Sequence, residues 1–299
     1  MQDKKIISRV LEDNSEVIDY DSSGIPLYIK TECLSYYLDM RSTAHWHDDL
    51  EIMYIIHGEL IYHVNKQNLH LSTNDCVIVN SRQIHFSSSY RHRECTFTCI
   101  VFHPQLFSGN AQLYESLFLP IIKNPSFEYV HVKASHPLHD KLSKLVFGIM
   151  TNKAEKNIGY EVKIIGALYT FWGTFAELSG YLTMSCGAAR DADMAAQKDM
   201  VSFIHQCYMQ DLTLNDIASA GHVGRNKCCL LFKEYLHQSP IEFLIQYRLE
   251  KGCLLLKKTD SSITEISEKC GFNNVSYFCQ KFKSRYGCSP RIYRKTAEN

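Results

Sequence analysis

Short runs of alternating apolar and polar residues fill the chain from about Leu27 to Phe102. Examples are the stretches Glu51 to Ile56 and Cys76 to Val79. Residues that favour turns separate these runs, at Gly58, 65–68 and 72–75. Alternation with a period of two residues is typical of half-buried β-strands. The pattern predicts an antiparallel β-barrel or meander within residues 1–136.

The pattern becomes helical from Pro137, with apolar residues three or four positions apart. Two such runs occur, formed by Leu138, Leu142, Leu145, Val146 and Ile149, and by Val162, Ile165, Leu168, Tyr169, Trp172, Phe175 and Leu178. They predict a helical pair over 137–182, whose apolar stripe must pack on the β domain or on a second subunit of a homodimer. Ser, Gly, Ala and Asp dominate residues 183–194, which predicts a linker.

An internal repeat occupies residues 195–299. Phe232-Lys233 recurs as Phe282-Lys283, and Ser239-Pro240 recurs as Ser289-Pro290. Each copy reads as a short helix, a turn carrying Gly221 or Gly271, and a longer helix, which is the plan of a helix-turn-helix. We therefore predict helix-turn-helix motifs at about 214–235 and 263–286, joined by a helix over 241–258. The predicted fold class is α+β, with the β domain and helical pair followed by this all-α module.

The second repeat carries the clearer local signals. Ser262 and Glu265 can form a capping box at its first helix, and Asn274 can cap its second. Phe278 and Phe282 share the inward face of that second helix. The outward residues are predicted to contact DNA bases and are Val275, Ser276, Cys279 and Gln280. Gln280 is the strongest candidate because its amide can bond bidentately to adenine.

The same registration of the first repeat predicts a second set of base contacts. Its outward residues are Arg225, Asn226, Cys229 and Leu230, of which Arg225 suits guanine and Asn226 suits adenine. Nearby cations are candidates for phosphate contacts, which position a protein without reading sequence. They are Lys227, Lys233, Lys281, Lys283, Arg285, Arg291 and Arg294. A small helical bundle that binds other proteins is the alternative interpretation of this segment.

Charge supports nucleic-acid binding at this end of the chain. The net charge is zero, but residues 195–299 hold 15 Lys and Arg against 10 Asp and Glu. The N-terminus carries no apolar signal-peptide core, and no apolar run approaches the roughly 20 residues needed to cross a membrane. The 12 cysteines are scattered, with no zinc-ligand spacing. We expect a cytoplasmic protein with reduced thiols and no membrane partner.

The C-terminal segment resembles the AraC/XylS family of bacterial transcription regulators. The resemblance rests on Ile263-Thr-Glu-Ile-Ser-Glu-Lys-Cys-Gly-Phe, Phe278, Phe282-Lys283, Gly287, Ser289-Pro290 and Tyr293-Arg294. It implies a seven-helix module whose two recognition helices enter successive major-groove turns of double-stranded DNA, about 34 Å apart. It also implies a regulator, more often an activator, with RNA polymerase as a partner. The first repeat departs from the family pattern at Gly224 and Cys228.

His45, His47, Glu51 and Gly58 have the spacing of the first cupin motif, and His85 lies where the second motif has its histidine. Three imidazoles and a carboxylate can hold a transition metal, but the second motif departs from its usual pattern at Ser72 and Asn74. We therefore expect no cofactor and a cupin-like pocket for a small-molecule effector such as a sugar. The candidate effector-binding residues are His45, Trp46, His47, Glu51, Tyr54 and His85. Tyr36, Tyr37 and Tyr62 are further candidates for lining the pocket.

Two alternatives from other functional classes remain open. One is a metal-dependent cupin enzyme fused to a DNA-binding module, with His45, His47, Glu51 and His85 as its ligands. The other is a redox or metal sensor that acts through thiols such as Cys228 and Cys229. We expect an effector-responsive regulator rather than an enzyme, because the helix-turn-helix signature is the more complete of the patterns.

Overall fold

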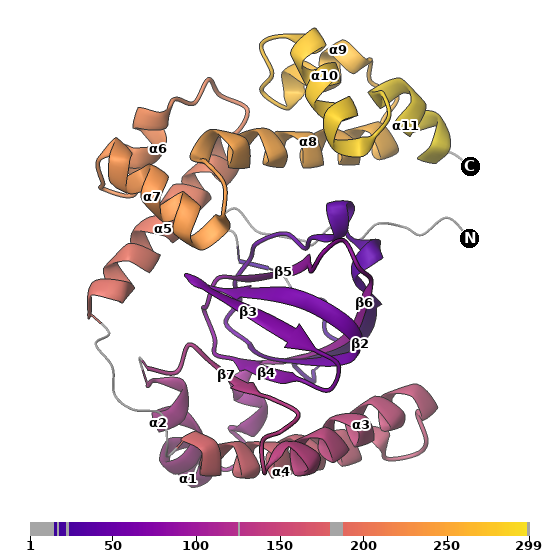
Figure 1. Cartoon of the computed structure of the whole chain (residues 1–299), viewed down its shortest axis with the longest axis vertical. Coiled ribbons are helices and arrows are strands. Elements are labelled where there is room, and N and C mark those ends of the chain that lie inside the picture. The colour runs from indigo at the N-terminus through magenta and orange to yellow at the C-terminus, as the bar shows by residue number, and fades with distance from the viewer. Residues whose placement is uncertain (1–14, 17, 22–23, 125, 180–187, 298–299) are drawn as a thin grey trace. The chain divides into compact units, whose positions relative to one another are not determined.

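The computed structural model describes residues 15–16, 18–21, 24–124, 126–179 and 188–297. The described residues divide into two compact units, 15–189 and 190–297 (Figure 1). The first unit contains the β-strands and the helical pair together, and the second is helical throughout. The predicted α+β fold class is confirmed.

Seven strands make up the sheet in the described part of the first unit, and all pair antiparallel. They are β1 (Leu27–Cys33), β2 (Leu50–Val64), β3 (Gln67–Ser72), β4 (Cys76–Val79), β5 (His85–Ser89), β6 (Cys95–Phe102) and β7 (Tyr129–Val132). The main order is β1-β6-β2-β4-β7, and β3 and β5 both pair with β2. Among these strands the pairing branches at β2 and does not close into the predicted barrel.

The branch arises because β2 changes partners at Gly58. Residues 50–58 pair with β6, whereas 59–64 pair with β3 and 60–64 with β5. Gly58 has φ of 92°, and a Cβ atom there would lie 2.4 Å from the carbonyl oxygen of Glu94. Glycine alone combines this backbone conformation with such a close approach. The bend therefore explains the glycine of the first cupin-like motif.

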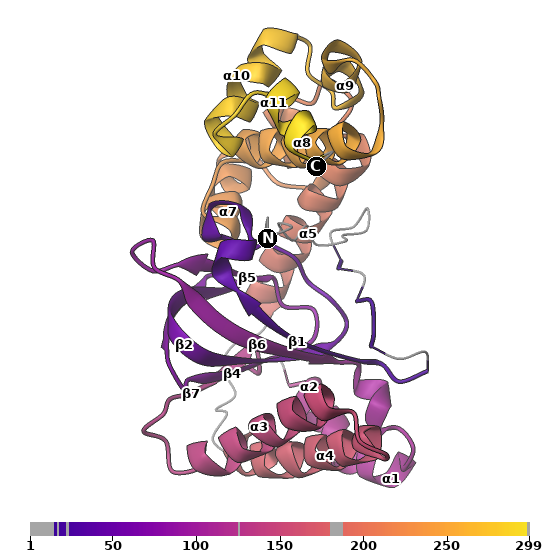
Figure 2. The same ribbon diagram turned by 90° about the vertical axis from the view of Figure 1, so that its right-hand side faces the viewer.

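The two faces of β2 have different neighbours. Ile52 and Tyr54 belong to a core that includes side chains of α3 (His139–Glu155) and α4 (Tyr160–Ser179). Those helical side chains are Leu142, Val146, Ile149, Ile164, Leu168, Phe171, Trp172 and Phe175. Figure 2 shows α3 and α4 lying along this face of the sheet. The stripe of the helical pair is therefore covered by the sheet of its own chain.

The opposite face of β2 points into the interior of the β structure. Met53 and Ile55 pack there with Leu60, Tyr62 and Phe97. Shorter elements complete the unit, namely 3₁₀ turns at Leu34–Tyr36, Leu38–Met40 and Pro104–Phe107, α1 (Ala111–Leu113), a π-helical turn at Tyr114–Phe118 and α2 (Leu119–Ile122).

The second unit contains seven described helices. They are α5 (Ala188–Cys207), α6 (Leu214–Ala220), α7 (Arg225–Leu236), α8 (Pro240–Lys258), α9 (Ile263–Lys269), α10 (Val275–Tyr286) and α11 (Pro290–Ala297). Figure 1 shows α6 and α7 at one end of α8, and α9, α10 and α11 at the other. None of the described helices is long and apolar enough to cross a membrane.

The start of α5 corrects the predicted linker over 183–194. Residues 183–187 lie outside the described part of the chain, but the helix begins at Ala188. The alanines within residues 188–196 explain the difference, because alanine has the highest intrinsic helix propensity.

Candidate functional site

The first unit contains a partly open cavity of about 260 Å³ on the interior side of its sheet. Strands β1, β2, β5 and β6 form most of its wall. The rest comes from the connection between β1 and β2 and from the N-terminal residues Glu16, Ile18 and Asp19. Its lining residues are Glu16, Ile18, Asp19, Tyr28, Lys30, Glu32, Tyr37, Ser42, His45, Glu51, Met53, Tyr62, His85, Phe86, Ser87, Phe97, Cys99 and Val101. The wall therefore combines aromatic rings with ionisable and hydroxyl groups, as small-molecule sites commonly do.

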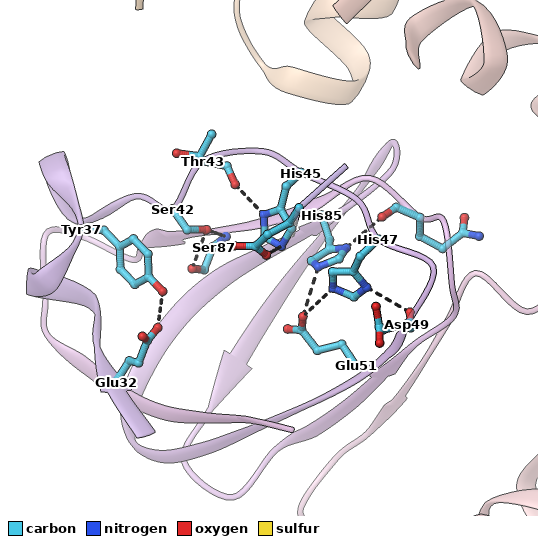
Figure 3. A network of polar contacts seen from close by, with 12 residues as sticks. Glu32, Tyr37, Ser42, Thr43, His45, His47, Asp49, Glu51, His85 and Ser87 are labelled. Carbon is cyan, nitrogen blue, oxygen red and sulfur yellow. Dashed lines mark hydrogen bonds and ion pairs between the residues drawn. The ribbon is translucent and has the colours of Figure 1, made fainter. Parts of the chain in front are cut away.

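A buried carboxylate and three imidazoles meet at one end of this cavity (Figure 3). Glu51 accepts a hydrogen bond from the Tyr62 hydroxyl at 2.9 Å and lies 3.4 Å from His47 Nε2 and 3.2 Å from His85 Nε2. Nε2 of His45 lies 3.0 Å from a carboxylate oxygen of Glu16. Burial alone would raise the pKa of Glu51, but the imidazoles of His85 and His47 hold it well below its usual value.

Each of the three imidazoles is oriented by a backbone carbonyl. The Nδ1 atoms lie 2.8 Å from Thr43 O for His45, 3.1 Å from Asp49 O for His47 and 2.8 Å from Gln83 O for His85. A carbonyl can only accept, so each Nδ1 carries a proton and donates it. Each Nε2 faces a carboxylate, so it either holds a second proton or presents its lone pair to a metal ion.

The donor set suits a divalent transition metal. One ligand atom from each of His45, His47, Glu51 and His85 lies within 4.8 Å of all the others. Ligands about 2.0–2.2 Å from a zinc ion lie roughly 3.3 Å apart in a tetrahedral site, so side-chain shifts of about 1 Å would complete the coordination. The Nδ1 hydrogen bonds to carbonyls are also the outer-shell contacts that orient histidine ligands. These residues can therefore hold a metal.

A second polar group occupies another part of the cavity wall. The Tyr37 hydroxyl donates to the carboxylate of Glu32, and Lys30 forms an ion pair with the same carboxylate. Burial, reinforced by Glu32, raises the pKa of Tyr37, and burial with Glu51 raises that of Tyr62. Both phenols are therefore neutral hydrogen-bonding groups at physiological pH.

The predicted effector residues fall into three groups. His45, Glu51 and His85 line the cavity, whereas His47 belongs to the cluster without lining it. Trp46 and Tyr54 do not line it. Tyr54 points toward α3 and α4 because it follows Met53 on a strand, where successive side chains alternate between faces.

Among the tyrosines proposed as further lining residues, Tyr37 and Tyr62 do line the cavity and Tyr36 does not. Tyr28, Lys30 and Glu32 also line the cavity and were not predicted; they lie two residues apart on β1. Their period-two spacing was the signal that could have found them.

In the second unit, the predicted recognition helix of the second repeat corresponds to α10. The predicted capping box joins Ser262 and Glu265 at the start of α9, and Asn274 accepts a hydrogen bond from the backbone N–H of Tyr277 at the start of α10. Both caps satisfy N–H groups that have no partner inside the helix. The local sequence signals therefore give the helix starts correctly.

The first repeat lacks one of these caps. Thr213 and Asp216 form a capping box at α6, but Gly224, at the N-cap of α7, makes no side-chain capping hydrogen bond. The two turns also show that Gly221 and Gly271 do not occupy equivalent positions. His222, with φ of 53°, occupies the left-handed position that Gly271, with φ of 81°, takes in the second repeat.

Most of the predicted base-contacting residues are accessible. Arg225, Asn226, Cys229 and Leu230 on α7 are exposed, as are Ser276 and Gln280 on α10. Val275 and Cys279 are half-buried, and Cys279 packs against the core of the second repeat. Tyr277 is 41% exposed and was missed. The solvent-exposed face of α10 therefore includes Tyr277 and is rotated away from the predicted face, which included Val275 and Cys279.

The predicted phosphate contacts also divide into groups. Lys233, Lys283 and Arg291 are exposed. Lys227 forms an ion pair with Asp193 at 2.9 Å, and the Lys281 ammonium lies 5.4 Å from the centre of the Tyr277 ring. Arg294 donates to the carbonyl of Ser261, and Arg285 lies 3.8 Å from half-buried Glu250. The last two arginines are engaged inside the unit, which weakens their candidacy.

Comparison with known proteins agrees with both parts of this description. A model described as an AraC-like ligand binding domain matches residues 30–170, and one described as a helix-turn-helix domain matches 217–296. The HTH-type transcriptional regulator YdeC of Bacillus subtilis (strain 168) is 26% identical, over 96% of this chain and 98% of its own. The regulator YdiP of Escherichia coli (strain K12) is 23% identical, over 87% and 83%.

A solved structure with a similar extent is that of wild-type ToxT from Vibrio cholerae strain SCE256 with a bound unsaturated fatty acid. It is 16% identical, covers 90% of this chain and 94% of its own, and superposes with a TM-score of 0.42.

The two matching domain models together span most of the sequence and join a ligand-binding domain to a DNA-binding one. The chain belongs to the AraC family of transcriptional regulators.

Proposed function

We propose that this regulator binds a small-molecule effector in the cavity of its first unit and that occupancy of the cavity controls DNA binding. The observation that carries the proposal is the 260 Å³ space lined by both rings and polar groups inside the ligand-binding domain. Ligand binding can control DNA binding by favouring one arrangement of the chain over another. The protein then acts in the cytoplasm as a regulator and not as an enzyme.

His45, Glu51 and His85 are the proposed effector contacts at one end of the cavity, with Glu32 and Tyr37 at the other. Carboxylates can accept hydrogen bonds from ligand hydroxyl groups, and tyrosine rings offer faces on which a sugar ring can stack. A sugar-like effector suits this lining. Trp46 and Tyr54 do not line the cavity and are not among these contacts.

A cavity-filling variant tests this location. A ligand found in a thermal-shift screen of the full chain against sugars and aromatic compounds should stabilise the first unit by about 2.7 kcal/mol at 100 times its Kd. Trp46 and Trp172 are the only tryptophans, so tryptophan fluorescence follows this unit. Cys99→Phe should remove the shift, and Gln112→Phe, on exposed α1, should retain it. An unchanged shift in Cys99→Phe would place the ligand elsewhere.

We propose that α7 and α10 read bases and that the exposed lysines beside them contact phosphates. Gln280→Ala should relax base preference at about one position of the site, at a cost of about 1–3 kcal/mol for the preferred base. Lys283→Ala should weaken binding to all sequences about equally and reduce its salt dependence. Selection from a randomised DNA pool measures both effects. An unchanged selected motif for Gln280→Ala would contradict this placement of α10.

Dimer formation and activation complete the proposed mode of action. Three apolar side chains of the helical pair are exposed: Phe147 on α3 (44%), Ile158 in the turn between α3 and α4 (102%) and Val162 on α4 (74%). They could form a contact between two copies. A monomer at all concentrations in light scattering would contradict this. Activation through contact with RNA polymerase is proposed from the family resemblance, and a promoter–reporter measurement with and without the chain gives its sign.

A divalent metal is a second candidate ligand for the cluster at His45, His47, Glu51 and His85. The three Nδ1–carbonyl hydrogen bonds favour it because they leave all three Nε2 atoms directed at carboxylates. The thiol alternative is not favoured at Cys228. Cys228 is buried, and burial raises its pKa to about 11, so its thiol is almost fully protonated at neutral pH and reacts poorly.

A further inference from the structure

Helix α8 divides its side chains between the two helix-turn-helix repeats. In its first half, the Phe243 ring packs edge-on against Phe232 of α7, and the Tyr247 ring stacks 3.9 Å from His205 of α5. In its second half, Leu249, Cys253 and Leu256 form one core with Ile266, Cys270, Phe272, Phe278 and Phe282 of the second repeat. The boundary between the two cores falls at Arg248.

Arg248 connects segments from both sides of this boundary. Its Nε donates to the carbonyl of Tyr208 at 2.7 Å, and its Nη2 donates to that of Gln210 at 2.7 Å. Both carbonyls belong to the loop that joins α5 to α6 in the first repeat. The guanidinium carbon also lies 5.8 Å from the centre of the Phe272 ring, in the turn of the second repeat.

The same loop contacts the turn of the second repeat directly. A Cβ atom at Gly271 would lie 2.4 Å from Tyr208 O, 2.9 Å from the Met209 Cα and 3.0 Å from Arg248 Nε. The absence of a side chain at Gly271 therefore lets loop 208–210 reach the second repeat. The two repeats are joined through α8 and, independently, through this loop.

We propose that Arg248 is a positioning residue that fixes the orientation of the second recognition helix relative to the first. A connection through α8 alone leaves bending and twisting of one helix to set that orientation. With the second connection, α8, loop 208–210 and the turn at Gly271 contact one another and form a closed frame. Arg248, on α8, holds the loop in this frame through its two hydrogen bonds. B-DNA makes one turn in about 10–10.5 base pairs, so the frame determines which spacing of two subsites both helices can read.

Arg248→Met is the test, because it keeps an aliphatic stem and removes both hydrogen bonds. Wild-type full-length protein should lose affinity about tenfold or more when one base pair is inserted between the two halves of its selected site. The variant should lose only about two- to threefold on the same insertion, while its affinity for either half alone stays unchanged. Binding titrations on the four DNA duplexes measure these ratios.

Two further variants make the test specific. Lys258→Met removes an exposed cation from the same helix and should keep the wild-type spacing preference. Arg248→Lys keeps the charge without the two-armed fork and should fall between wild type and Arg248→Met. If Arg248→Met is too unstable by thermal unfolding, Arg248→Lys alone decides the question. Equal weakening on all four duplexes with an unchanged spacing ratio would overturn the proposal.

Discussion

Gly271→Ala is expected to unfold the second helix-turn-helix and to abolish high-affinity DNA binding. The left-handed backbone conformation, with φ of 81°, destabilises alanine by about 1–2 kcal/mol relative to glycine. Its Cβ would also meet the carbonyl of Tyr208 at 2.4 Å, a backbone atom that cannot move without breaking its hydrogen bond from Arg248. Together these costs should exceed about 3 kcal/mol, a large share of the stability of a typical domain.

Gly287→Ala is the matched control for this variant. Gly287 ends α10 with φ of 73°, but a Cβ atom there would meet nothing within 4 Å. It should therefore cost only about 1–2 kcal/mol, from the backbone alone. Far-UV circular dichroism during urea unfolding of the full chain compares the two variants. Equal losses would show that contact with loop 208–210 contributes nothing.

Tryptophan fluorescence provides an internal reference in the same experiment. Trp46 and Trp172 both lie in the first unit, so their unfolding transition should be the same in wild type and in both glycine variants. A shifted tryptophan transition in Gly271→Ala would contradict the assignment of the damage to the second unit.

The sequence predicted those features that depend on neighbouring residues. Ser262, Glu265 and Asn274 act within one helical turn of the groups they cap, so their roles could be read directly. The strand pattern around Glu51 could likewise be read, because alternation is a local property. Because successive side chains on a strand alternate between its faces, the sequence would also have shown that Tyr54 and Glu51 face opposite sides of the sheet.

Features that depend on distant segments were not accessible in this way. Glu16 reaches His45 only because two separate segments of the chain come together at the cavity. Arg294 resembled a phosphate contact by its charge, yet its guanidinium binds the carbonyl of Ser261, 33 residues earlier. Charge predicts the class of partner, and tertiary contacts decide which cations remain available to it.

Metal binding by the cluster at His45, His47, Glu51 and His85 has the other large expected effect. Without an ion, the Nδ1 atom of each imidazole faces a carbonyl oxygen and its Nε2 atom faces a carboxylate oxygen of Glu16 or Glu51. Hydrogen bonds from both nitrogens of all three rings would therefore require three buried imidazolium ions beside these two carboxylates. Taking several charges from water together is costly. A divalent ion removes the need for the second protons, because each Nε2 lone pair then becomes a ligand.

Zinc or manganese ions added to metal-stripped full-length protein should therefore bind at one ion per chain and raise the unfolding midpoint followed by tryptophan fluorescence. At 100 times Kd the gain is about 2.7 kcal/mol, which corresponds to about 5–10 °C for a unit of this size. His85→Ala should abolish the shift, because it removes a buried ligand, whereas His70→Ala removes an exposed histidine and should retain it. If calorimetry finds no ion bound, or if His85→Ala binds as tightly as wild type, the cluster is a hydrogen-bonded cavity wall around Glu51 and the metal candidate is wrong.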